Sequence, residues 1–224
     1  MILTAVIALA GALYLRRIPR VAVWRAGSFF LGLAAVWVAV ASPVASMDSN
    51  MLTAHMIQHL LLMTIAPPLI WMGEPFTLRR GALIVHPVFC WLAAAAALVV
   101  WHVPAILRLG MESPVWHFIE HASFLTAGLL FWWPVFQPGP RWSMLLYLFL
   151  ATLPCDVLSG LLVFSDRVAY PIYVCTPARA GLSPLEDQQC AAALMWTCVT
   201  VVFLLAGTIL SAQMLSPRRE AVPL

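Results

Sequence analysis

The segment SNMLTAHMIQHLLLMTIAPPLIWM, residues 49–72, contains no lysine, arginine, aspartate or glutamate. A helix of about 20 predominantly apolar residues is long enough to cross the hydrocarbon core of a bilayer. Further apolar runs fill the rest of the chain, at about residues 1–15, 24–42, 87–103, 115–136, 142–164 and 186–212. The sequence therefore predicts an all-α, polytopic membrane helical bundle with about seven transmembrane helices.

The composition agrees with this interpretation and excludes a soluble protein. Of the 224 residues, 63% are hydrophobic and 9% are charged, which is far outside the range of soluble globular domains. The seven runs leave no room for a separate soluble domain, so residues 1–224 are predicted to form a single integral membrane domain surrounded by lipid. The formal net charge of +3 comes with arginines in short loops between spans, and this placement does not indicate a nucleic-acid partner.

The arginines indicate which end of each span faces the cytoplasm, because loops on that side are enriched in basic residues. With seven spans, nine of the twelve arginines lie on one side of the membrane. The other three are Arg108, Arg167 and Arg179. This split predicts an N-terminus outside the cell and a C-terminus in the cytoplasm.

Five of the six histidines then fall at the extracytoplasmic ends of their spans, and only His86 falls at the cytoplasmic side. Two pairs of them are spaced by four residues, which places both members of a pair on one helix face. Imidazoles are costly inside a bilayer, so such a cluster indicates metal, haem or proton chemistry. The candidate metal ligands are His55, His59, His102, His117 and His121.

Methionines extend one of these pairs into a longer stripe, because Met51, His55, His59 and Met63 follow one another at every fourth position. Thioether and imidazole together suit Cu(I), whereas histidines alone suit Zn(II) or Cu(II) equally well. Methionine at this spacing is also typical of simple packing. Copper, bound as Cu(I), is the predicted cofactor, with Met51 and Met63 as additional candidate ligands.

Carboxylates inside the spans are the second chemical signal. Glu120 lies between His117 and His121 in sequence, although on a different helix face from either. Asp156 interrupts the sixth span in its outer half and should pair with a histidine, an arginine or a metal, or be protonated. Asp187 opens the seventh span, where a helix N-terminus favours negative charge. Asp156 and Asp187 complete the set of additional candidate ligands.

The chain contains five cysteines, an odd number that leaves at least one unpaired or bound to something else. Cys175 and Cys190 lie in or beside the same outer loop, where an oxidising compartment would allow a disulfide. Metal ligation by these two thiols is equally compatible with the sequence. Cys90 and Cys198 fall within spans and are interpreted as packing residues.

Six stretches of the chain resemble one known family. Three of them, HMIQHLLLMTIAPPLIWMGEP (55–75), WHVPAIL (101–107) and HFIEHASFLTAGLLFWWPV (117–135), contain the five clustered histidines. The others are SGLLVFS (159–165), YPIY (170–173) and GLSPLEDQQCAAALMW (181–196). Together they cover most of residues 48–200 and resemble the CtaG family of cytochrome c oxidase assembly factors, in its multi-span membrane form.

The resemblance implies a multi-pass protein of the bacterial plasma membrane that is not an enzyme. It implies that the protein assists assembly of haem–copper cytochrome c oxidase, with oxidase subunits as partners, by supporting copper delivery to the metal centres. The family positions that carry over to this chain are His55, His59, His102, His117, His121, Asp187 and Gln188.

Copper binding at the extracytoplasmic face is thus the first functional hypothesis. Two alternatives remain open at this point. The first is a membrane haem-binding oxidoreductase, with His55 or His59 opposite His117 or His121 as axial ligands. The second is a scaffold without metal, in which the imidazoles only satisfy buried polar groups.

Overall fold

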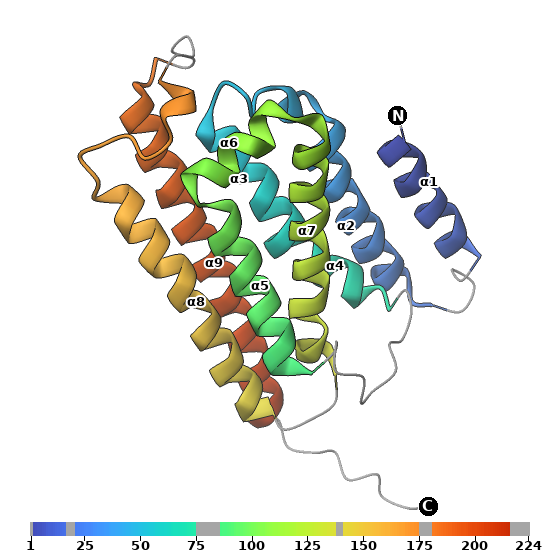
Figure 1. The fold of residues 1–224 in the computed structure, drawn as a ribbon. Helices are drawn as coiled ribbons and strands as arrows, with labels where there is room; N and C mark the ends of the chain where they lie inside the picture. The colour runs from blue at the N-terminus through green and yellow to red at the C-terminus, as the bar shows by residue number, and fades with distance from the viewer. Residues whose placement is uncertain (1, 17–20, 75–85, 138–140, 175–180, 216–224) are drawn as a thin grey trace, which may run out of the picture.

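A computed structural model describes residues 2–16, 21–74, 86–137, 141–174 and 181–215. Every regular element in these ranges is helical, and most of the helices run side by side in one elongated bundle (Figure 1). The α-helices are α1 (Ile2–Leu15), α2 (Val23–Ala41), α3 (Leu52–Leu60), α4 (Ala66–Met72), α5 (Pro87–Trp101), α6 (Pro104–Glu112), α7 (Pro114–Trp132), α8 (Arg141–Val163) and α9 (Pro184–Leu215). A π-helical segment, Leu61–Ile65, joins α3 to α4, and short 3-10 turns occupy Pro43–Ser46, Pro134–Phe136 and Pro171–Tyr173.

Several of these helices are long and apolar enough to cross a membrane. Length and composition qualify α2, the continuous segment Leu52–Met72, α8 and α9, and the α5–α6 pair, bent by 78°, makes a fifth. The 14-residue α1 is too short, and the histidines and glutamate of α7 lower its hydropathy. The all-helical, multi-span architecture is therefore confirmed, with four to five spans by this measure. The count of seven and the orientation of the termini stay predictions.

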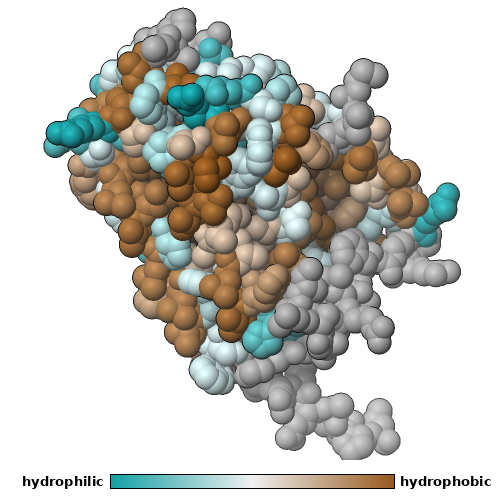
Figure 2. All heavy atoms as spheres, in the orientation of Figure 1, coloured by the Kyte–Doolittle hydropathy of each residue, from teal (hydrophilic) through white to brown (hydrophobic). Residues whose placement is uncertain are grey.

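The surface agrees with a membrane environment. Hydrophobic side chains cover much of the flank of the bundle, and hydrophilic ones gather towards the end that carries α6 (Figure 2). Large apolar residues of α8 and α9 face outwards, among them Phe149 and Leu204, which are 63% and 65% exposed. Exposed side chains of this kind are stable only against lipid or another apolar surface.

The segment Leu52–Met72 is the central element of the bundle. In an apolar window of 18 residues of this segment, 61% of the residues are buried, against 33%, 28% and 17% in the corresponding windows of α2, α8 and α9. It is packed against α2, α7 and α9, so polar side chains on it are enclosed by other helices instead of lipid.

The π-helical segment Leu61–Ile65 directly follows His59. Proline has no N–H, so Pro67 cannot donate to the carbonyl group four residues before it, which belongs to Met63. That carbonyl instead accepts a hydrogen bond from the indole Nε1 of Trp132 at 3.3 Å. Gly128 of α7 permits this close approach, because a Cβ atom there would lie 2.7 Å from the Met63 carbonyl oxygen. Single π turns are frequent beside functional sites.

Helix α6 lies where the hydropathy pattern predicts a loop between two spans. It begins at Pro104, a favoured first residue of a helix, and turns by 78° from α5. Its buried residues, Leu107 and Gly110, face the bundle, and it packs against α7. The helix therefore covers the end of the bundle from which α3 and α7 start (Figure 1).

Candidate metal centre

The centre is formed where the first turns of α3 and α7 face each other. His55 and His59 project from α3 and Glu120 from α7. One carboxylate oxygen, Oε1 of Glu120, lies 3.3 Å from Nε2 of His55 and 3.3 Å from Nε2 of His59. His55 and Glu120 are fully buried, and His59 is 5% exposed. Their ligand atoms lie within 4.8 Å of one another, close enough to bind one metal ion together.

A second group shares His55 and lies closer to the surface. Oδ2 of Asp48, in the turn before α3, lies 2.9 Å from Nε2 of His117. Asp48, His55 and His117 again have ligand atoms within 4.8 Å of one another. The His117 side chain is 30% exposed, so this outer group is the part of the centre that solvent reaches. We call the two groups together the His–carboxylate centre.

Asp48 is anchored and ionised in this position. Its backbone carbonyl accepts a hydrogen bond from the Tyr173 hydroxyl at 3.1 Å. Burial acts to raise the pKa of the Asp48 carboxyl, but the contact with His117 and the charges of His117 and His55 outweigh it. The pKa of Asp48 is therefore lowered from its ordinary value, and the carboxylate is available as an anionic ligand.

The two remaining histidines are held by backbone carbonyl groups. His102 Nδ1 donates to the Leu98 carbonyl at 2.7 Å, and its ring centroid lies 6.0 Å from that of His59. His121 Nδ1 donates to the His117 carbonyl at 2.9 Å, and its Nε2 lies 3.2 Å from Oε1 of Gln58. His102 thus keeps Nε2 available as a ligand atom, whereas His121 is engaged at both nitrogens.

The donor atoms of the inner group, His55, His59 and Glu120, lack hydrogen-bond partners. Within the ranges that the structure describes, no hydrogen bond is made by either ring nitrogen of His55 and His59 or by either carboxylate oxygen of Glu120. Their mutual contacts at 3.3 Å are ion-pair approaches without hydrogen-bond geometry. A buried polar atom left in this state costs about 1–3 kcal/mol. A metal ion bound between Nε2 of His55, Nε2 of His59 and Oε1 of Glu120 would give each of these three atoms a partner, so the donor set fits one.

Helix α6 closes over the carboxylate. A Cβ atom at Gly110 would lie 2.6 Å from Oε2 of Glu120, so any larger residue there would require the carboxylate to shift. On the same turn of α7, the Ser123 hydroxyl donates to the Glu120 carbonyl at 2.7 Å and accepts from Trp101 Nε1 at 2.7 Å. These contacts fix the position from which Glu120 reaches the histidines.

Asp187, a further candidate ligand, contacts the start of the helix that carries His55. Its carboxylate accepts hydrogen bonds from the backbone N–H groups of Leu52 at 2.6 Å and Thr53 at 3.2 Å. Asp187 therefore caps the N-terminus of α3 from α9, which satisfies N–H groups that have no partner within the helix. This contact sets the position of the turn that carries His55. Gln188 acts similarly, since its Oε1 accepts from the Ala169 N–H at 2.7 Å.

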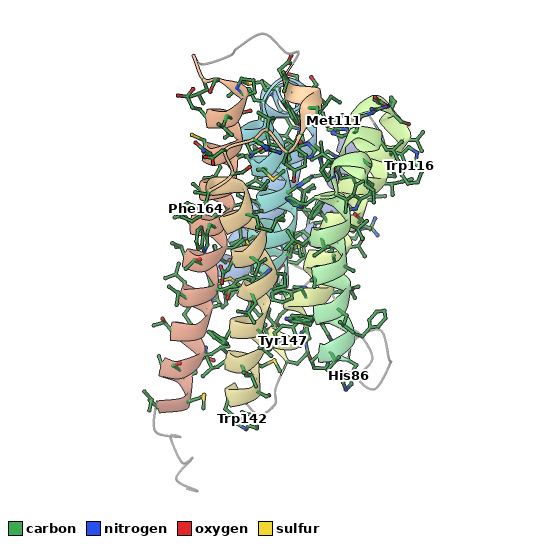
Figure 3. All side chains as sticks on the ribbon, turned by 60° about the vertical axis from the view of Figure 1, so that its left-hand side comes forward. His86, Met111, Trp116, Trp142, Tyr147 and Phe164 are labelled. Atoms are coloured by element: carbon green, nitrogen blue, oxygen red, sulfur yellow. The ribbon has the colours of Figure 1, made fainter. Side chains whose placement is uncertain are left out.

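The other candidate ligands are distributed around the centre. Met51 is half-buried just before α3, and Met63 lies in the π-helical segment. Asp156 is half-buried on α8, and no hydrogen bond or ion pair joins it to the clustered histidines within the described parts of the chain. The pairing of Cys175 with Cys190 involves a residue outside the described ranges. His86 is exposed and lies at the opposite end of the bundle from Met111 and Trp116 (Figure 3).

Two residues of the centre were missed or misjudged at the sequence level. Asp48 precedes the predicted span, and nothing in its spacing marks it as a partner of His117. Glu120 was noted, but its helix face was compared with those of His117 and His121. The relevant neighbours, His55 and His59, are on another helix. The sequence signal that could have identified Glu120 is a carboxylate flanked by two histidines within an apolar span.

Fold and site together define a polytopic helical membrane protein with a buried His–carboxylate centre at one end. The family model of the cytochrome c oxidase caa3 assembly factor (Caa3_CtaG) matches residues 7–216, nearly the whole chain. The chain belongs to this family, which confirms the resemblance recognised in its motifs. We found no match among curated proteins or among solved structures.

Proposed function

We propose that this protein supports assembly of haem–copper cytochrome c oxidase by binding copper at the His–carboxylate centre on the extracytoplasmic side of the bacterial plasma membrane. Family membership supports the link to the oxidase. The observation that carries copper binding is Glu120, a fully buried carboxylate lying 3.3 Å from two imidazole nitrogens that have no hydrogen-bond partner.

The methionines near His55 and His59 in sequence led to the prediction of Cu(I). The ligands of the His–carboxylate centre favour a different oxidation state of copper. The centre combines imidazole nitrogens with two carboxylates, Glu120 and Asp48. Nitrogen and oxygen donors bind Cu(II) more tightly than other divalent first-row ions. The charges of the two carboxylates also balance a divalent ion in a buried position. The proposed ion at this centre is therefore Cu(II).

Replacement of Glu120 tests this proposal. Glu120→Gln keeps the shape of the side chain but removes its charge. The Cu(II) affinity of the detergent-purified protein should therefore fall at least about tenfold. Replacing a residue that only contacts a metal ligand typically already lowers metal affinity by this factor. Copper content and the paramagnetic resonance signal of Cu(II) measure this loss. His86→Ala, exposed at the other end of the bundle, is the control and should bind like the wild type. Equal copper binding by Glu120→Gln and wild type would refute the proposal.

The geometry favours a small ion over haem. The ring of Phe124 stacks on that of His59 with centroids 3.9 Å apart, and Glu120 fills the space between His55 and His59 on one side and α7 on the other. A macrocycle between α3 and α7 would have to displace both side chains. An absorption spectrum of the purified protein checks this point, and we expect no Soret band.

The side of the membrane on which the centre lies follows from the orientation of the chain. The C-terminal end of α9 and the α6 end of the bundle lie at opposite ends (Figure 1), and the arginine distribution predicts a cytoplasmic C-terminus. A C-terminal alkaline phosphatase fusion should therefore be inactive and a fluorescent-protein fusion bright. The reverse pattern would place the centre at the cytoplasmic face and exclude extracytoplasmic copper as its source.

A further inference from the structure

A cavity of about 60 Å³ lies inside the bundle next to the His–carboxylate centre, between α3, α5, α7, α8 and α9. Space for a water-sized probe of about 10–15 Å³ already holds one water molecule, so the cavity can accept a single ion. Its wall is mostly apolar. The possible metal ligands in it are His59, His102, Met56, Met63, Met195 and Cys155, and the Thr64 hydroxyl and the Trp91 indole also line it.

His102 is prepared as a ligand in this wall. Its Nδ1 donates to the Leu98 carbonyl at 2.7 Å, which fixes the tautomer with a lone pair on Nε2. That Nε2 is buried and has no hydrogen-bond partner among the described residues, and the whole residue is 5% exposed. Metal-binding histidines usually show this arrangement, with the second ring nitrogen held by a carbonyl or carboxylate.

The three thioethers come from three different helical segments that line the cavity. Met56 and Met195 are 2% and 3% exposed, and Met63 belongs to the π-helical segment after His59. Within the described chain, no aspartate or glutamate lines the cavity. The donors therefore differ in kind from those of the His–carboxylate centre, being neutral and mostly soft.

We propose that this cavity is a second metal site, which binds one Cu(I) ion through His102 and the thioethers of Met56, Met63 and Met195. Thioether and imidazole ligands select Cu(I) among the common ions. The cost of burying an ion in an apolar interior rises with the square of its charge. Neutral ligands leave that charge uncompensated, so a monovalent ion is favoured here over Zn(II) or Cu(II).

The inference rests on the proposed function, since it treats copper as the ion that the protein handles. His59 lines both the cavity and the His–carboxylate centre, so the two sites adjoin each other along α3. The outer centre, which solvent reaches through His117, and the deeper cavity would thus hold copper in different oxidation states. Each site can be tested without the other because their ligands differ.

The test compares Cu(I) binding to detergent-purified full-length protein with and without two of the three thioethers. Met63→Leu/Met195→Leu keeps the volume of both side chains, a change that cores tolerate well. Anaerobic titration with Cu(I) against a colorimetric Cu(I) chelator should show an affinity at least tenfold below that of the wild type. X-ray absorption of the Cu(I)-loaded wild type should show sulfur neighbours, and the double variant, which keeps only the thioether of Met56, should show fewer of them.

Three comparisons make the outcome decisive. Met144→Leu is the matched control, because Met144 does not line the cavity but a neighbouring groove of about 990 Å³ between α5 and α8, and this variant should bind Cu(I) normally. The double variant should keep the Cu(II) resonance signal, which also shows that it is folded. Glu120→Gln should show the reverse pattern, with Cu(II) lost and Cu(I) retained.

Sulfur-free coordination in the wild type, or unchanged Cu(I) affinity in the double variant, would overturn the cavity site. A wild-type protein that binds no Cu(II) but binds Cu(I) through sulfur would instead overturn the His–carboxylate centre. The cavity site would then still stand. The two failures are therefore distinguishable in one set of samples.

Discussion

Replacing His55 with alanine is expected to lower cytochrome c oxidase activity in the host membranes at least about tenfold, while the variant itself accumulates normally. His55 is common to both groups of the His–carboxylate centre, so its removal takes one ligand from each. Disturbing only the neighbours of metal ligands already costs 10–100-fold in affinity or activity in other proteins. Oxidase activity and the level of the variant, measured in the same membranes, check this prediction.

Two further variants provide the controls. His117→Ala removes a ligand from the outer group only and should have a smaller effect than His55→Ala. His86→Ala, exposed at the opposite end of the bundle (Figure 3), should be silent. Copper added to the medium should partly restore the activity of both ligand variants, since site occupancy follows mass action. A scaffold without metal predicts a different result, with loss of activity only where the protein level falls and no rescue by copper.

The sequence predicts the bundle well because each apolar run marks its own helix without reference to its neighbours. The runs at residues 87–103, 142–164 and 186–212 correspond to Pro87–Trp101, Arg141–Val163 and Pro184–Leu215. Helix α6 was missed because it is short and amphipathic, with Arg108 and Glu112 paired on its exposed side. Hydropathy alone does not distinguish such a segment from a polar loop.

The site could be predicted only in part, for a related reason. Spacing by four residues shows that His55 and His59 share a face, because both lie on one helix. It does not show that Glu120 points at them, because this depends on how α7 is rotated against α3. The contacts of Asp48 with His117 and of Gln58 with His121 could not be predicted for the same reason, since each joins two separate segments of the chain. Asp187 was found, but its role as a cap on α3 belongs to the tertiary structure.

The packing that fixes this rotation leads to the second prediction. Gly128→Ala should destabilise the protein by about 1–3 kcal/mol, the usual cost of overpacking a core. A Cβ atom at this position would lie 2.7 Å from the carbonyl oxygen and 2.8 Å from the Cα of Met63. Both are backbone atoms of the π-helical segment, which cannot move aside as a flexible side chain can. Thermal unfolding of the detergent-purified variant should therefore begin several degrees below that of the wild type.

Gly160→Ala is the matched control for this change. Gly160 lies within α8, and a Cβ atom there would meet nothing within 4 Å. Alanine is favoured over glycine in a helix by about 1 kcal/mol, so this variant should be as stable as the wild type or more so. The contrast separates the close contact at Gly128 from the general effect of replacing a helical glycine. Equal unfolding temperatures for Gly128→Ala and Gly160→Ala would mean that α7 and the π-helical segment do not pack this closely. Glu120 would then not be held against His55 and His59 by that contact.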